Sequence, residues 1–346
     1  MSRPLRVLYV VPRRNTFTDI DHQVLAERFE VIEYFQPGLR PRVFELVGKL
    51  RSCDVVFAWF ASWHSFATLI LARLLRRPSV LVVGGFDTAN VPDIGYGWQR
   101  GGIRQWVSRR TMALATRLVT NSRSSLAEIQ ANVGMDPGRV TVVHHGLADR
   151  FPDGGEPDRD RVALTVGVVR RRNLLRKGLL PFVRAAALLP DVQFVVAGGW
   201  REDAADVLRG EAGPNVRLAG FLEDAELDAL FRRAAVYVQA SRHEGFGLSL
   251  AEGMLAGCVP VVTDAGALPE VVGDVGVTIS AATPELIAEG VSRAIEMDRR
   301  EGTRARDRVL GSFPLRARAE ALWREVEAAA RRQRTDNAPA AATNQA

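Results

Sequence analysis

The residues with the clearest chemical potential lie between positions 241 and 257. This stretch contains two glutamates, Glu244 and Glu252, with the glycines Gly245 and Gly247 between them. Ionised carboxylates only accept hydrogen bonds, so the two acids suit a ligand that is rich in hydroxyl groups. The glycines lack a Cβ and therefore allow a ligand to approach the backbone closely. The pattern predicts a binding site in which carboxylates and backbone amides act together.

Two apolar runs flank this stretch, Ala235–Gln239 and Val259–Thr263, and both predict buried parallel strands. The glycine turn then leads from a strand into a helix, whose first N–H groups have no partner inside the helix. That helix end is positive and lies at the carboxyl edge of the sheet, where open α/β sheets bind ligands. We expect a phosphate on the amides of Phe246, Gly247 and Leu248, and sugar hydroxyls on the two acids. Together these groups describe a nucleotide sugar.

The motif E-G-F-G-L-x-x-x-E, followed by G-x-V-P-V-V and by Gly266–Glu270, resembles that of the retaining glycosyltransferases with the GT-B fold. Within that fold it is similar to the type called glycosyl transferases group 1, or family 4. The resemblance covers nearly all of the second half of the chain and, more loosely, the first half. It implies an α/β fold of two Rossmann-like parallel-sheet domains that face each other across a cleft. A buried strand–turn–helix with a surface pair of acids is the structural alternative.

Composition sets the broad class of the protein. The 346 residues suffice for two domains, and 47% hydrophobic and 25% charged residues are typical of a soluble globular chain. No apolar run reaches the ~18 residues of a membrane-spanning helix, and Met1–Pro4 leads into a strand-like run without a signal peptide. Cys53 and Cys258 are expected as free, buried thiols. We therefore expect a cytoplasmic protein, with peripheral attachment to the inner face of the membrane as the alternative.

Basic residues are concentrated in the first half of the chain, where residues 1–150 hold 20 Lys and Arg but 12 Asp and Glu. An anionic lipid or an acidic acceptor fits this charge, whereas nucleic acid is not expected, because no recognised binding motif accompanies it. A predicted helix carries Trp106 beside Arg104, Arg109 and Arg110. We favour an amphipathic helix packed on the domain, and contact with a membrane surface is the alternative.

Strand and helix patterns alternate along the chain and predict two parallel-sheet domains. Residues 1–150 form the expected acceptor-side domain, and residues 151–160, rich in Pro, Gly and Asp, form a linker. Residues 161–312 form the expected nucleotide-sugar-binding domain. The resemblance implies that residues 313–333 form a last helix that crosses back onto the first domain. Residues 334–346 are expected to be a disordered tail.

A run of cations follows the first strand of the second domain. A leaving diphosphate gains negative charge, and fixed cations stabilise it. The resemblance implies an arginine and a lysine in this run that flank the diphosphate. We assign the lysine to Lys177 and the arginine to Arg171, with Arg170 as the close alternative. Arg172 and Arg176 are expected to be solvated.

The resemblance also implies roles for positions outside the two main motifs. Asp87 is the nearest counterpart of a polar residue that faces the reacting sugar, with a turn or helix-capping aspartate as an equal alternative. Gly198 is expected in a tight turn near the nucleotide. Leu222 is expected beside the base, with core packing as its alternative. Glu270 is expected to brace its turn rather than to contact the donor.

The resemblance implies retaining transfer of a sugar from a nucleotide-sugar donor to a hydroxyl of a glycan, a lipid-linked or a small-molecule acceptor. Glu244 is assigned to the donor sugar, Glu252 to the ribose, and Arg171 and Lys177 to the diphosphate. No aspartate-rich metal motif appears, so no metal or other cofactor is expected. An epimerase or phosphorylase of the same fold and a non-catalytic binding module are the alternatives.

Overall fold

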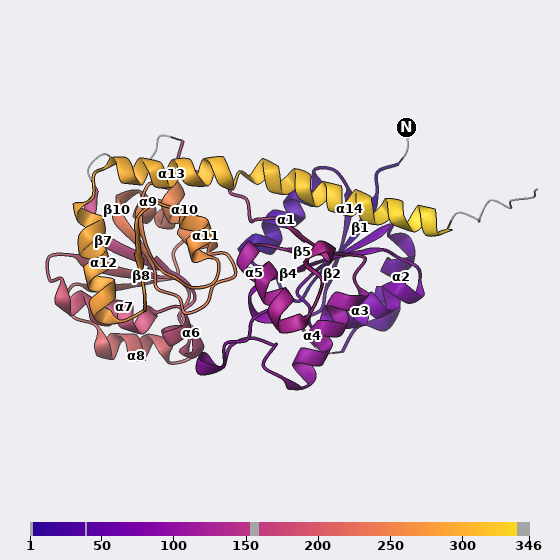
Figure 1. Cartoon of the computed structure of the whole chain (residues 1–346), viewed down its shortest axis with the longest axis horizontal. Helices are drawn as coiled ribbons and strands as arrows, with labels where there is room; N and C mark the ends of the chain where they lie inside the picture. The colour runs from indigo at the N-terminus through magenta and orange to yellow at the C-terminus, as the bar shows by residue number, and fades with distance from the viewer. Residues whose placement is uncertain (1–2, 39, 153–158, 338–346) are drawn as a thin grey trace, which may run out of the picture.

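A computed structural model describes residues 3–38, 40–152 and 159–337, which form two domains side by side (Figure 1). Each domain contains a six-stranded sheet in which every pair of neighbouring strands is parallel. Helices cover the sheets, as the connections between parallel strands require. The predicted α/β fold with two Rossmann-like domains is therefore confirmed.

The sheet of the first domain has the strand order β2-β1-β3-β4-β5-β6. Its central strands are buried along their whole length and are apolar apart from Ser79, which is typical of a sheet covered on both faces. The strands are β1 (Arg6–Val11), β2 (Glu30–Phe35), β3 (Val55–Trp59), β4 (Ser79–Val83), β5 (Arg117–Thr120) and β6 (Val140–Val142). The helices are α1 (Thr16–Ala26), α2 (Val43–Ser52), α3 (Trp63–Leu74), α4 (Gly102–Leu114) and α5 (Arg123–Glu128).

The sheet of the second domain has the order β12-β11-β10-β7-β8-β9. The strands are β7 (Asp160–Val166), β8 (Gln193–Ala197), β9 (Val216–Gly220), β10 (Ala234–Gln239), β11 (Val259–Thr263) and β12 (Val277–Ile279). The helices are α6 (Arg171–Arg176), α7 (Leu179–Ala185), α8 (Ala204–Glu211), α9 (Asp224–Arg233), α10 (Leu248–Leu255), α11 (Leu268–Val272), α12 (Pro284–Glu296) and α13 (Arg300–Ser312). Short α6 contains Arg171, Arg172 and Arg176 of the cation run.

Helix α14 (Leu315–Asn337) returns from the second domain and lies along the first (Figure 1). At the crossing point, Leu147 exchanges backbone hydrogen bonds with Phe313 (2.9 Å) and Leu315 (3.0 Å), so the outgoing and returning chains are paired. The helix continues past position 333, the helix end expected from the sequence. The other residues of the expected tail, 338–346, and most of the linker, 153–158, lie outside the described residues.

A buried ion pair holds α14 against α1. The guanidinium of Arg318 contacts the carboxylate of Asp21 at 2.6 and 2.7 Å, and neither side chain is more than 1% exposed. Nearby, the indole of Trp323 donates to the carbonyl of Val24 at 2.8 Å. Because a buried charge without its partner is costly, this pair fixes the position of the helix. No helix in the described part of the chain is both long enough and apolar enough to cross a membrane.

Candidate active site

Helix α10 begins at the carboxyl edge of the second sheet, directly after the glycine turn. Its N-cap, Gly247, has a φ of 99°, a left-handed conformation that residues with a Cβ rarely adopt. The amides of Phe246 and Gly247 donate no hydrogen bond to any described residue. An anion at this position would satisfy both amides and would meet the positive end of the helix dipole.

The turn is anchored by the ring of Phe246, which is 3% exposed. This ring lies 5.2 Å from His145 of the first domain and 5.2 Å from Phe313 at the crossing point. His145 in turn stacks on Trp59, with ring centroids 5.9 Å apart. The aromatic contacts therefore fix the turn between the two domains while its amides remain without a partner.

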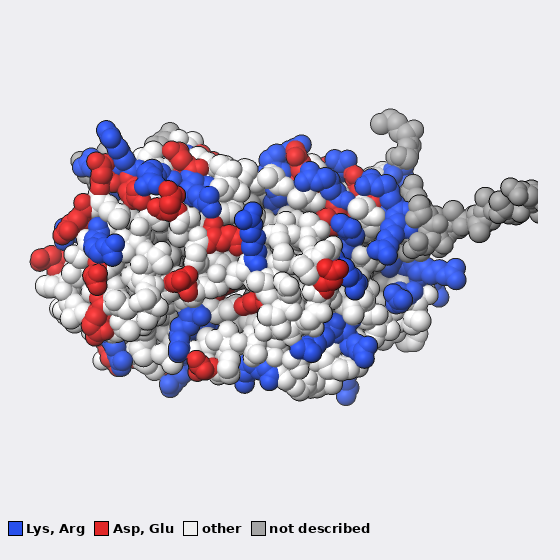
Figure 2. Space-filling view, viewed as in Figure 1, with Lys and Arg blue, Asp and Glu red and all other residues white. Residues whose placement is uncertain are grey.

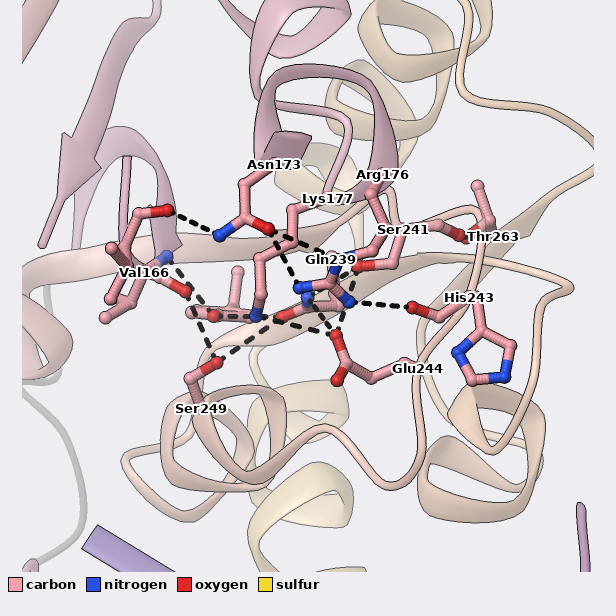
Figure 3. Close-up of polar contacts among 12 residues, drawn as sticks. Val166, Asn173, Arg176, Lys177, Gln239, Ser241, His243, Glu244, Ser249 and Thr263 are labelled. Carbon is pink, nitrogen blue, oxygen red and sulfur yellow. Dashed lines mark hydrogen bonds and ion pairs between the residues drawn. The ribbon is translucent and has the colours of Figure 1, made fainter. Parts of the chain in front are cut away.

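Glu244 is the centre of a polar network at the end of β10 (Figure 3). Its Oε2 lies 3.5 Å from the Nζ of Lys177 and accepts hydrogen bonds from Gln239 and Ser241, both at 3.3 Å. Burial alone would raise the pKa of Glu244, but the charges of Lys177, Arg176 and His243 lower it below its usual value. The carboxylate is therefore ionised, and a ligand hydroxyl can donate to it.

The backbone of Glu244 is held by the turn that follows β11. Its carbonyl accepts a hydrogen bond from the amide of Ala267 at 3.0 Å. Gly266 has a φ of 58°, and a Cβ there would lie 2.3 Å from the carbonyl oxygen of Glu244, so no larger residue fits. The second half of the motif thus positions the first acid of the site.

The side chain of Lys177 extends toward Glu244 past two closely packed glycines, Gly167 and Gly198. A Cβ on Gly167 would lie 3.2 Å from the side chain of Lys177, and a Cβ on Gly198 would lie 2.2 Å from the carbonyl oxygen of Gly167. Gly198, expected in a turn near the nucleotide, is therefore in close backbone contact with the turn that supports Lys177. Leu222 is partly buried and packs against the core of the second domain, as its structural alternative requires.

The two arginines weighed for the diphosphate have opposite environments. Arg171 is exposed and forms an ion pair with Asp203, with its Nε 2.6 Å from the carboxylate. Arg170 is partly buried, and its Nε has no hydrogen-bond partner among the described residues. Burial, and then the nearby cations Arg172, Arg176 and Arg13, lower the pKa of Arg170 to about 10. An anion would relieve both effects, so the geometry favours Arg170 over Arg171.

Arg176 is not solvated, contrary to the expectation from the sequence. Its guanidinium is buried, with its Nη2 3.1 Å from the side-chain oxygen of Asn173 and its Cζ 4.9 Å from the ring centroid of Tyr96. It also donates to the carbonyl of His243 at 3.3 Å (Figure 3). Because Tyr96 belongs to the first domain and Asn173 to the second, Arg176 contributes to the contact between the domains. Arg172 is exposed, as expected.

Glu252 lies in the second turn of α10 and contacts Arg150 at the start of the linker, 3.3 Å from its Nη2. The same arginine contacts Asp228 at 3.0 Å. Burial of Glu252 outweighs the attraction of Arg150, and it raises the pKa of the carboxyl group to about 7. Near neutral pH, Glu252 therefore exists in both protonation states, and a ligand hydroxyl favours the ionised one.

Asp87 braces a turn of the first domain. Its two carboxylate oxygens accept hydrogen bonds from the amides of Ala61 and Gly84, both at 2.9 Å, and the residue is fully buried. Burial raises its pKa to about 7 in spite of these bonds. The structure thus favours the turn-bracing alternative. The turn that Asp87 braces packs closely against Gly245 of the motif. A Cβ on Gly245 would lie 3.0 Å from the amide nitrogen of Gly85.

Two histidine–glutamate pairs join the domains beside the site. His243 of the second domain lies 2.6 Å from Glu128 of the first, and His144 of the first lies 2.6 Å from Glu270 of the second. Glu270 also accepts hydrogen bonds from the amide of Arg123 (2.9 and 3.1 Å), at the start of α5. Among the described residues, the carboxylate of Glu270 bonds only to groups of the first domain, so it braces that domain and not, as the sequence predicted, its own turn.

The sequence predicted no individual role for six residues of this network: Asn173, Tyr96, Gln239, Ser241, His243 and Glu128. Three of them lie in or next to the motif, and their types alone give no signal of a site. Their roles depend on contacts between elements that are distant in the sequence. Among the described side chains, which lie within residues 3–38, 40–152 and 159–332, no three of His, Cys, Asp or Glu come together as metal ligands.

Two family descriptions match this chain. Residues 149–308 match the glycosyl transferases group 1, and residues 3–150 match glycosyltransferase family 4. The two matches together run from the first described strand to α13. The chain belongs to the group 1 glycosyltransferases with the GT-B fold, which confirms the membership that the motif predicted.

Individual relatives match smaller parts of the chain than the two family descriptions together. A D-inositol 3-phosphate glycosyltransferase of Mycolicibacterium gilvum is 33% identical over 176 residues, which are 46% of this chain and 39% of the relative. A GDP-mannose:cellobiosyl-diphosphopolyprenol alpha-mannosyltransferase of Xanthomonas campestris is 28% identical over 231 residues, 63% of this chain and 58% of the relative. The matched regions thus span only about half the length of these relatives.

Solved structures share the fold at low sequence identity. HepE of Anabaena, in complex with UDP and glucose, has a TM-score of 0.76 at 15% identity, and the match covers 93% of this chain and 99% of HepE. Sucrose-phosphate synthase of Thermosynechococcus elongatus has a TM-score of 0.75 at 17% identity, covering 94% of this chain and all of that chain. These likenesses establish the two-domain architecture.

Proposed function

We propose that this protein is a retaining, metal-independent glycosyltransferase that moves a sugar from a nucleotide-diphosphate sugar to a hydroxyl acceptor. The observation that carries the proposal is the ion pair of Lys177 and Glu244 beside the unpartnered amides of Phe246 and Gly247. Cation, amides and carboxylate match the diphosphate and the hydroxyls of such a donor. The complexes of HepE with UDP and glucose and with UDP-glucose support the same donor class.

In this proposal the diphosphate lies on the amides at the start of α10, with Lys177 and Arg170 as its cations. Glu244 accepts hydrogen bonds from the donor sugar, and Glu252 accepts them from the ribose. As the bond between the sugar and the diphosphate breaks, the fixed cations and amides stabilise the growing charge on the leaving group. The acceptor oxygen bonds to the sugar carbon on the same face, and its proton passes to the leaving phosphate. No metal is needed in this scheme.

The proposal is tested by incubating the protein with UDP-, GDP- and ADP-sugars, with and without hydroxyl acceptors, in the presence of EDTA. A thermal-shift screen first selects the donor, since a ligand that binds only the folded state raises the melting temperature. We expect release of the nucleoside diphosphate, retention of anomeric configuration by NMR, and loss of turnover in Lys177→Ala and Glu244→Gln. Turnover that these variants retain would contradict the proposal.

The alternatives give different products in the same assay. An epimerase releases an isomerised nucleotide sugar without any acceptor, and a phosphorylase requires inorganic phosphate. A non-catalytic binding module binds the donor but leaves it intact. The ion pair of Glu244 and Lys177 and the Nε of Arg170, which has no partner among the described residues, support the transferase, because a module that only binds has no need to stabilise a leaving group.

We also propose that the protein acts on the cytoplasmic side of a membrane surface, through the basic first domain. Helix α4 supports this, because Ile103 is 61% and Trp106 is 48% exposed. Arg109 donates to Gln99 and to the carbonyl of Asn132, whereas Arg104 and Arg110 are exposed. Flotation with liposomes tests this contact: Arg104→Ala with Arg110→Ala should weaken it, and a protein that never floats contradicts it.

A further inference from the structure

Two adjoining pockets lie at the amino edge of the first sheet, opposite the edge that carries the candidate active site. Their volumes are about 290 and 270 Å³, and they share Ala115, Thr116, Arg139 and Arg332. Strands β4 and β5 begin here, and helices α3 and α4 end here. We call the two together the twin pocket. Neither the transfer reaction nor the donor site uses it.

The lining of the twin pocket is strongly cationic. It contains six arginines and no Asp or Glu: Arg73, Arg76, Arg77, Arg117, Arg139 and Arg332. Glu325 neutralises Arg117, with contacts of 2.7 and 3.0 Å, and Arg77 donates to the backbone carbonyl of Arg51 at 2.8 Å. Arg73, Arg76 and Arg139 form no ion pair with a described carboxylate. The pocket therefore holds positive charge that nothing in the described chain compensates.

The surface next to the twin pocket is unusually apolar for a charged region. On α3, Ile70 is 37% and Leu74 is 73% exposed, on either side of Arg73. One ring contact, between Phe66 and Trp106 at 5.5 Å, joins this stripe to the exposed face of α4. Exposed apolar side chains thus continue from the twin pocket along α3 and α4. Figure 2 shows many Lys and Arg side chains on the surface of the first domain. Apolar residues flanked by arginines are typical of surfaces that lie in a membrane interface.

We infer that the twin pocket binds the phosphate headgroup of an anionic phospholipid while Ile70 and Leu74 enter the membrane interface. Guanidinium groups bind phosphate in a bidentate manner, so several of them around one pocket suit such a headgroup. A free anion would use the arginines but would leave Ile70 and Leu74 exposed to water. The inference deepens the proposed membrane contact, on which it rests, and does not depend on the transferase activity.

The test is co-sedimentation of the full chain with vesicles of phosphatidylcholine alone and of phosphatidylcholine mixed with phosphatidylglycerol. The pocket variant Arg73→Gln with Arg139→Gln is compared with Arg161→Gln with Arg217→Gln, which removes the same charge from exposed sites on the second domain. Each arginine near an anionic surface contributes enough that we expect the pocket variant to bind about tenfold more weakly or worse. The matched control should bind the mixed vesicles like the wild type, and Leu74→Ser should also weaken binding.

The other outcomes separate this inference from the proposals before it. A pocket variant that binds vesicles as well as its matched control overturns the inference. If Arg104→Ala with Arg110→Ala then abolishes vesicle binding, the proposed membrane contact through α4 is still supported. A wild type that binds neither vesicle overturns both. In a further outcome, inorganic phosphate raises the melting temperature of the wild type but not of the pocket variant, and the wild type binds no vesicles. This result would mean that the twin pocket binds free anions, and it would also overturn the inference. Glu244→Gln should bind vesicles normally, whatever its turnover.

Discussion

Adjacent arginines in the candidate site have the same chemistry but opposite surroundings. Arg170 is partly buried with an unpartnered Nε, and Arg171 is exposed and paired with Asp203. We predict that Arg170→Ala lowers turnover about 100-fold, because one preorganised group that stabilises charge in the transition state has roughly that effect. Arg171→Ala should change turnover less than about twofold, since exposed ion pairs contribute little. Initial rates at saturating donor measure both, and an equal or larger loss in Arg171→Ala contradicts the assignment.

The raised pKa of Glu252 predicts that donor binding depends on pH. The carboxyl group titrates at about 7 in the free protein, and only its ionised form accepts hydrogen bonds from a ribose at both oxygens. Ionisation increases as the pH rises, so the dissociation constant should fall about tenfold from roughly pH 6 to pH 8. Calorimetric titration with the donor at each pH measures this dissociation constant. Glu252→Gln should bind weakly with little pH dependence, and an unchanged slope in this variant would assign the titration to another group.

Among the elements, the glycine turn before α10 serves two contacts at once. Its amides are free for a ligand, and Gly245 lies against the Gly84–Gly85 turn that Asp87 braces. A Cβ at Gly245 would lie 3.0 Å from the amide of Gly85, which belongs to the other domain. The turn therefore links donor binding to the separation of the domains.

We predict that Gly245→Ala impairs turnover more than stability. The added methyl group pushes the turns of the two domains apart rather than disrupting a core, so the melting temperature should change little. Misplacement of catalytic groups by a fraction of an ångström should lower kcat/KM about tenfold or more. Gly199→Ala is the matched control, because a Cβ there meets nothing within 4 Å. Equal kinetics in the two variants would argue against a role for the contact.

The sequence predicted most of the elements but not the contacts between them. Apolar runs predicted β10 and β11, the motif pointed to Glu244, and the family resemblance pointed to Lys177, because these signals are local. The orientation of Arg170 and Arg171 depends on α6, a helix whose six residues are too few to give a periodic pattern in the sequence. Burial of Arg176 requires Tyr96, which lies 80 positions earlier in the printed sequence and in the other domain. Such long-range contacts have no local pattern.

At the scale of the whole molecule, the chain crosses twice between the domains, and α14 closes the architecture. The core of the first domain includes Leu322, Trp323 and Val326 of this helix, so the end of the chain completes the fold of its beginning. The two histidine–glutamate pairs add polar contacts across the boundary between the domains. Site residues on the second domain are therefore positioned by contacts that only the assembled molecule provides.

The buried pair of Asp21 and Arg318 should be the strongest single polar contribution to this assembly. We predict that Asp21→Asn lowers the free energy of unfolding by about 3–5 kcal/mol, since it leaves the buried guanidinium without its counter-charge. Glu320→Gln makes the same chemical change in an exposed pair with Arg316 and should cost less than about 1 kcal/mol. Urea denaturation compares them. Similar losses in the two variants would show that α14 is held by apolar packing alone.

The most direct test of the central claim is a crystal structure of the protein with the nucleotide sugar that raises its melting temperature most. The diphosphate is predicted to lie within hydrogen-bond distance of the amides of Phe246 and Gly247 and of the Nζ of Lys177, with the sugar hydroxyls on Glu244. A donor that binds with its diphosphate away from the start of α10, or with its base rather than its sugar on Glu244, would contradict the account.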